Sequence, residues 1–168
     1  GGPDITNEFI ASLKSLEGLP IWLVIRLCTD EPQVCQFYSD LDGELEISLD
    51  VIDDFMDEAT EVTKHNQWLT YAYPLHCLRE LGINDRVFDM IDERPLTRGE
   101  LYNFCCVLFG VRSLPDPAVE WVNFVKSIER LQKHETKVWN PTKTKKTTWI
   151  DLRKLHAEHG DGSKCVIM

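Results

Sequence analysis

The chain has 168 residues, of which 43% are hydrophobic and 27% charged, a composition typical of a globular protein of one domain or one domain with an appendage. Its longest apolar run, residues 21–25, is far shorter than a membrane-spanning helix requires. The net charge of −10 is unevenly spread: residues 1–125 contain 8 Lys and Arg against 23 Asp and Glu, whereas residues 126–168 contain 10 against 5. The acidic body argues against general nucleic-acid binding.

The first predicted elements are a helix and a strand. Residues 4–17 place Ile5, Phe9 and Leu13 on one helical face. Residues 20–29 form a continuous apolar run, which predicts a strand buried on both faces. No second strand of this kind is evident further along the sequence. We therefore expect this portion to belong to a larger α/β domain whose other strands precede residue 1.

The middle of the chain has the periodicity of amphipathic helices. Thr97 and Glu100 have the spacing of a capping box, and Asp116 followed by Pro117 predicts another helix start. The aromatic residues around Trp68 are expected in the core. The predicted helices cover residues 33–41, 49–64, 74–81, 83–91, 97–109 and 117–134.

A hairpin and a short helix are predicted near the C-terminus. In residues 138–150 β-forming residues flank the turn residues Asn140 and Pro141. A helix over residues 151–158 and a glycine-rich tail follow. Three of the six cysteines, Cys28, Cys105 and Cys106, lie in apolar runs and no secretion signal is present, so we expect free thiols in a reducing, cytoplasmic setting.

The segment VFDMIDERPLTRGELYNF (residues 87–104) has part of the pattern of a calcium-binding EF-hand loop. With Asp89 as the first loop position, Glu93, Thr97 and Glu100 fall at the fifth, ninth and twelfth, where oxygen ligands belong. The pattern fails at two places, because an isoleucine stands at the third position and an arginine replaces the glycine of the sixth. We expect no bound calcium, and these four residues are the candidate ligands if the chain does respond to the ion.

Patterns that carry catalysis do not occur in the sequence. It contains no nucleophile-elbow motif and no phosphate-binding loop. It also lacks two pairs of Cys or His residues at the spacing of a zinc site. We therefore expect a protein that is not an enzyme.

The stretch GGPDITNEFIASLKSLEGLPIWLVIRLCTDEPQVCQFYSDLD (residues 1–42) resembles the late helix-strand-helix portion of a von Willebrand A-like domain. The later stretches WLTYAYPLHCLRELG, FDMIDERPLT and LPDPAVEWVNFV are similar to the helical extension of some eukaryotic proteins of this type. The Asp-x-Ser-x-Ser motif of the family's metal-dependent adhesion site does not occur in this sequence, so the resemblance implies no metal-binding residue here. It implies protein–protein recognition rather than catalysis.

The last four residues, Cys165-Val166-Ile167-Met168, match a C-a-a-X prenylation box, and methionine in the last place favours a farnesyl group on Cys165. One farnesyl chain anchors a protein only marginally, so a second signal is needed. Dispersed basic residues nearby would attract an anionic membrane surface. They are Lys143, Lys145, Lys146, Arg153, Lys154 and Lys164.

Together these patterns predict a mainly α fold with a small α/β portion. Four regions are expected: a von Willebrand A-like fragment (1–45), a helical extension (46–135), a hairpin with a short helix (136–160) and a flexible tail (161–168). The expected function is a non-enzymatic protein–protein interaction or scaffold module, with a farnesyl group as its only cofactor, held weakly at an anionic membrane surface in the cytoplasm. The alternative is a degenerate EF-hand-like protein that responds to calcium.

Overall fold

A computed structural model describes residues 3–29, 31–83 and 85–160. Helices account for 51% of the residues and strands for 12%, which confirms the prediction of a mainly α fold with a small strand content. The chain forms two compact units. Unit 1 holds residues 1–54 and 77–84, and unit 2 holds residues 55–76 and the chain from residue 85 onward.

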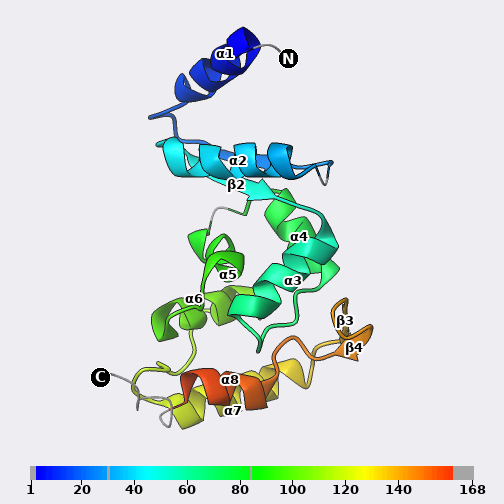
Figure 1. Cartoon of the computed structure of the whole chain (residues 1–168). Helices are drawn as coiled ribbons and strands as arrows, with labels where there is room; N and C mark the ends of the chain where they lie inside the picture. The colour runs from blue at the N-terminus through cyan, green and yellow to red at the C-terminus, as the bar shows by residue number, and fades with distance from the viewer. Residues whose placement is uncertain (1–2, 30, 84, 161–168) are drawn as a thin grey trace, which may run out of the picture. The chain divides into compact units, whose positions relative to one another are not determined.

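Unit 1 contains a parallel pair of strands joined by a crossover helix (Figure 1). Strand β1 (Trp22–Arg26) pairs with β2 (Ser48–Ile52), and α2 (Pro32–Glu44) connects them. Helix α1 (Pro3–Lys14) precedes β1. Parallel strands need such a crossover because their connection must return to the same end of the sheet. The buried side chains at the centre of this core are Leu13, Leu41, Leu45 and Leu49.

Two predictions for this region are wrong. A second strand does follow the first, and it occupies the start of the segment that was predicted to be a helix over residues 49–64. The β-branched residues Val51 and Ile52 favour an extended chain at that point, and α3 (Phe55–His65) begins only after two consecutive aspartates. The side chains of β1 are half-buried or exposed rather than buried on both faces.

A buried ion pair fastens the strands of unit 1 to the end of α4 (Tyr73–Glu80). Arg79 Nη2 lies 3.1 Å from Asp50 Oδ1 on β2, and the two side chains are 1% and 7% exposed. A charge buried this deeply is tolerated because it has an opposite charge and hydrogen-bonding partners beside it. Arg79 therefore fixes the last turn of α4, which belongs to unit 1, against β2.

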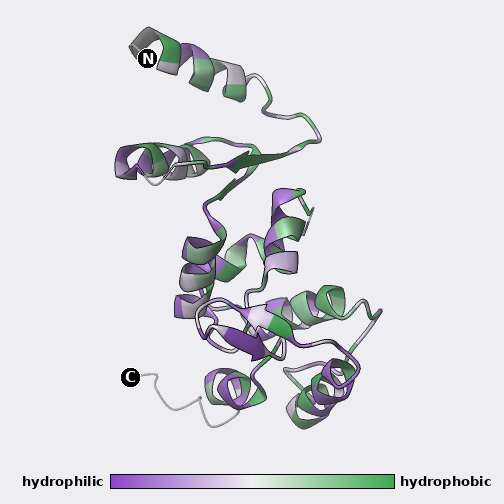
Figure 2. Ribbon diagram, turned by 90° about the vertical axis from the view of Figure 1, so that its right-hand side faces the viewer, coloured by the Kyte–Doolittle hydropathy of each residue, from purple (hydrophilic) through white to green (hydrophobic). Residues whose placement is uncertain are grey.

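Unit 2 is a helical body with one hairpin (Figure 1). In Figure 2 its helices carry hydrophobic and hydrophilic residues side by side, the colouring of amphipathic helices that turn one face to a core. Fully buried aromatic side chains form much of that core. Its elements after α3 are η1 (Arg86–Phe88), α5 (Met90–Glu93), α6 (Arg98–Leu108), α7 (Trp121–Gln132), β3 (Val138–Asn140), β4 (Lys145–Thr147) and α8 (Leu152–His159).

Helix termini in unit 2 follow the predictions in part. The capping box of Thr97 and Glu100 is confirmed at the start of α6, and the hairpin and the last helix are confirmed. The helix predicted over residues 83–91 is instead the short pair η1 and α5. Helix α7 starts at Trp121 rather than at residue 117. Residues 116–120 form a separate turn before it, in which the Asp116 side chain accepts from the backbone of Ala118.

Residues 66–70, here called the central segment, connect the parts of unit 2. Asn66 is fully buried, and its amide donates to the carbonyls of Ile91 (2.8 Å) and Arg94 (2.9 Å). Its Oδ1 accepts from the backbone of Leu96 (3.0 Å). One side chain thus satisfies three backbone groups of α5 and of its connection to α6, and leaving these groups unpaired would cost free energy.

The other end of the central segment holds the hairpin and α8. The backbone of Thr70 donates to the carbonyl of Trp149, and the backbone of Asp151 donates to the carbonyl of Trp68, each at 2.8 Å. Leu69 and Ile150 form an isolated antiparallel bridge between these two bonds. The chain leaving the hairpin is therefore fixed in register against a buried segment.

Helix α8 is held further by α6 and α7. Arg98 of α6 donates from Nε to the carbonyl of His159 (3.0 Å) and lies over the ring of Trp121, 5.1 Å from its centroid. The indole N–H of Trp121 donates to Nδ1 of His156 (2.9 Å). These contacts hold the C-terminal half of α8.

Asn66→Ala tests the role of the central segment. We expect a loss of about 3 kcal/mol in the free energy of unfolding of unit 2, because the substitution leaves three backbone groups buried without their partner. Urea denaturation followed by tryptophan fluorescence measures it, since four of the five tryptophans lie in unit 2. The control is the exposed Asn103→Ala. Equal, small losses in both variants would contradict the assignment.

Candidate functional site

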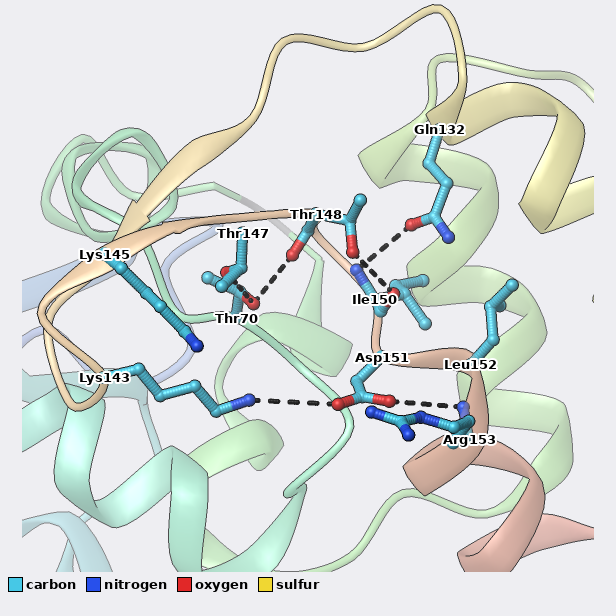
Figure 3. A pocket seen from close by; sticks show the side chains of 10 residues that line it. All are labelled: Thr70, Gln132, Lys143, Lys145, Thr147, Thr148, Ile150, Asp151, Leu152 and Arg153. Carbon is cyan, nitrogen blue, oxygen red and sulfur yellow. Dashed lines mark hydrogen bonds and ion pairs between the residues drawn. The ribbon is translucent and has the colours of Figure 1, made fainter.

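A hollow of about 410 Å³ lies beside the hairpin and the first turn of α8 (Figure 3). We call it the basic pocket because three of its lining side chains are cationic, whereas only one is acidic. All of its residues belong to unit 2. They are Thr70, Gln132, Lys143, Lys145, Thr147, Thr148, Ile150, Asp151, Leu152 and Arg153.

The hairpin supplies two of the cations through its strand alternation and its turn. Lys145 and Thr147 are two residues apart on β4 and both line the pocket, whereas Lys146 between them does not. The turn places Lys143, whose backbone N–H donates to Asn140 Oδ1 (2.9 Å). Thr144 closes the turn at a φ of 49°, in the left-handed region.

The third cation comes from the first turn of α8. Asp151 caps this helix, and its Oδ1 accepts from the backbone N–H groups of Arg153 (3.2 Å) and Lys154 (3.3 Å). Its other oxygen, Oδ2, lies 3.8 Å from Lys143 Nζ. Figure 3 shows Asp151 facing Lys143 across the pocket. The carboxylate thus orients one cation and fixes the helix that carries another.

The wall around Thr70 is internally hydrogen-bonded. Thr70 Oγ1 donates to the carbonyl of Thr148 (2.8 Å), lies 3.1 Å from Thr147 Oγ1 and accepts from the amide of Asn140 (3.4 Å). By contrast, the side chains of Lys145 and Arg153 make no hydrogen bond or ion pair within residues 3–29, 31–83 and 85–160. The pocket therefore combines a rigid wall with two cations that are available to a ligand.

The EF-hand candidates lie in a different arrangement from a calcium loop. Asp89 separates η1 from α5, and Glu93 ends α5. Both oxygens of Glu100 are engaged, because Arg94 donates from Nη1 to Oε2 (2.9 Å) and from Nη2 to Oε1 (2.6 Å). Thr97 also donates its backbone N–H to Glu100 Oε2 (2.8 Å). The structure thus brings Thr97 and Glu100 together as a helix cap.

The same contacts change the acidity of Glu100. The hydrogen bonds from the Arg94 guanidinium are the main reason that the pKa of Glu100 falls to about 2, and the bonds from Thr97 add to the effect. Among the described residues no cluster of three or more His, Cys, Asp or Glu side chains is placed to hold a metal ion.

The remaining predicted site residue, Cys165, lies outside the described residues. Sequence reasoning placed the pocket cations in a dispersed basic set and did not group Lys143, Lys145 and Arg153. Two local signals could have located these cations: the alternation of side chains on β4 and the Asp151 cap of α8. That the two elements line one pocket depends on the pairing of the central segment with residues 149–151, which is a tertiary contact.

Comparison with known proteins gives no relative from which a site can be transferred. The chain matches no family model, no curated protein and no solved structure. None of the helices in the described ranges has the length and apolar character needed to cross a membrane.

Glu100→Gln tests the electrostatic assignment of this residue. Because the pKa is lowered from about 4.5 to about 2 by folding, the ionised carboxylate stabilises the fold above pH 4.5, and this contribution is lost as the pH falls towards 2. We expect the unfolding free energy of the variant to change less than that of the parent between pH 4.5 and pH 2. Urea denaturation at a series of pH values measures it, with Glu135→Gln as the exposed control. Identical pH profiles for Glu100→Gln and the parent would contradict the assignment.

Proposed function

We propose that the chain is a non-enzymatic protein–protein interaction or scaffold module that works at an anionic membrane surface. The observation that carries the membrane part of this proposal is the basic pocket. It gathers Lys143, Lys145 and Arg153 within a chain whose first 125 residues are strongly acidic. Such a separation of charge orients a protein with its basic side towards an anionic partner.

The chemistry of the pocket supports binding rather than catalysis. The hydroxyl of Thr70 donates to a backbone carbonyl and supports the wall. Lys145 and Arg153 are exposed cations, which attract anions from solution. Each basic residue near an anionic leaflet contributes about 1 kcal/mol to attachment.

A farnesyl group on Cys165 is the second part of the proposal. Its support is the terminal Cys-Val-Ile-Met sequence. The preceding stretch Gly-Asp-Gly-Ser-Lys has the glycine and serine composition of linker sequences. A single prenyl chain gives marginal, reversible binding, so lipid and basic residues would act together. The result would be weak, salt-sensitive attachment on the cytoplasmic side of a membrane.

The protein-recognition part rests on unit 1. The parallel pair β1 and β2 with the crossover helix α2 has the connectivity found in α/β domains, and this supports the proposal of a von Willebrand A-like fragment. The calcium-responsive alternative has no comparable support, because Arg94 and the backbone of Thr97 engage the carboxylate of Glu100.

Expression in a eukaryotic cell tests the proposal. Intact-mass analysis should show a farnesyl group and loss of residues 166–168, and the protein should sediment with phosphatidylserine vesicles in a way that added salt reverses. The Cys165→Ser variant is the control and should lose the modification and most of the sedimentation. An unmodified C-terminus that still contains Met168 would contradict the lipid part, and equal sedimentation with neutral phosphatidylcholine vesicles would contradict the electrostatic part.

A further inference from the structure

We infer that the basic pocket binds a phosphomonoester group, carried either by a lipid headgroup or by a small soluble molecule. This inference deepens the proposed function and rests on it for the membrane as a source of the ligand. Its evidence is the charge, the free donors and the size of the pocket.

The charge of the pocket matches a phosphomonoester. Three cations and the carboxylate of Asp151 leave two positive charges among its lining residues, and a phosphomonoester carries a charge of about −1.5 to −2 at neutral pH. A carboxylate or a phosphodiester carries a single negative charge and would leave part of the positive charge unbalanced. Asp151 repels any anion and offsets one of the three positive charges, but the remaining net positive charge still attracts a dianion more strongly than a monoanion.

The donors that remain available suit phosphate oxygens. Arg153 presents a planar fork of N–H groups that bonds two phosphate oxygens at once, and Lys145 adds a point charge with up to three donors. Neither side chain has a partner within the part of the chain that the structure describes. Lys143 is held only loosely, at 3.8 Å from Asp151, and becomes a third donor when it turns to the ligand.

The size of the pocket sets the class of ligand. Its volume of about 410 Å³ is in the lower part of the range of small-molecule sites. Leu152, which is half-buried, adds apolar surface beside the cations, where the carbon atoms next to a phosphate group would pack. A small phosphorylated headgroup fits this combination.

Titration of the full-length, unmodified chain with glycerol phosphate tests the inference without a membrane. We expect Lys145→Gln and Arg153→Gln each to weaken binding about tenfold, the value of one charge-assisted hydrogen bond. Lys146→Gln is the matched control, because it removes the same charge from the next residue of β4 but does not line the pocket. We expect it to leave the affinity for glycerol phosphate nearly unchanged.

Asp151→Asn gives a test in the opposite direction. Asparagine caps helices about as well as aspartate, so α8 should keep its start while the opposing negative charge is removed. We expect severalfold tighter binding of glycerol phosphate. A residue with only a structural role would give unchanged or weaker binding. Circular dichroism of each variant verifies that the helices are intact.

Vesicles identify the source of the phosphate group. Phosphatidic acid ends in a phosphomonoester and phosphatidylserine contains a phosphodiester, so the two are compared in vesicles matched in total charge. Preference for phosphatidic acid that is lost in Lys145→Gln but not in Lys146→Gln supports the inference with a lipid source. If glycerol phosphate binds but phosphatidic acid is not preferred over phosphatidylserine, the result supports the inference and indicates that the phosphate group belongs to a small soluble molecule.

Three outcomes overturn the inference. In the first, the protein binds both lipids equally, Lys145→Gln and Lys146→Gln weaken this binding equally, and glycerol phosphate does not bind. This result would agree with the proposed membrane association but would show that the pocket is not the binding site. Binding of a phosphorylated peptide but of neither glycerol phosphate nor phosphatidic acid would assign the pocket to another class of ligand. Failure to bind any vesicle or phosphate would contradict the inference and the electrostatic part of the proposed function together.

Discussion

The arrangement of unit 2 depends on the central segment, a buried stretch that makes hydrogen bonds at both of its ends. Asn66 satisfies three backbone groups of the connection before α6, and Trp68 and Thr70 fix the chain that leaves the hairpin. Buried backbone groups must find partners, so these bonds admit few alternative arrangements. The two cationic elements of the pocket, β4 and α8, are both placed by this segment.

The pocket joins a hydrogen-bonded wall to exposed charges. Its threonines and Asn140 are bonded to one another, while Lys145 and Arg153 extend from exposed positions. An arrangement of this kind attracts anions over a distance and selects among them by charge and by the number of donors that reach them. Asp151 starts α8 and offsets one of the three positive charges of the pocket.

The sequence permitted accurate prediction wherever the signal was local. The capping box of Thr97 and Glu100 and the hairpin around Asn140 need only neighbouring residues, and both are found. The strand at residues 48–52 was missed because the acidic helix that follows it has a strong 3.6-residue hydrophobic pattern, and Leu49 and Val51 also fit that pattern. The EF-hand spacing was present, but spacing does not show that Arg94 binds Glu100. The pocket was missed because Lys145 and Arg153 line one hollow only where residues 147–151 pair with the central segment.

Mapping of backbone amide shifts by NMR during titration with glycerol phosphate tests the central claim most directly. If the basic pocket is the binding site, the largest and saturable changes fall on the amides of Lys145, Thr147 and Arg153 and on their neighbours along β4 and the first turn of α8. Changes that do not saturate, or that spread evenly over exposed lysines away from the pocket such as Lys126, Lys133 and Lys137, would contradict the claim.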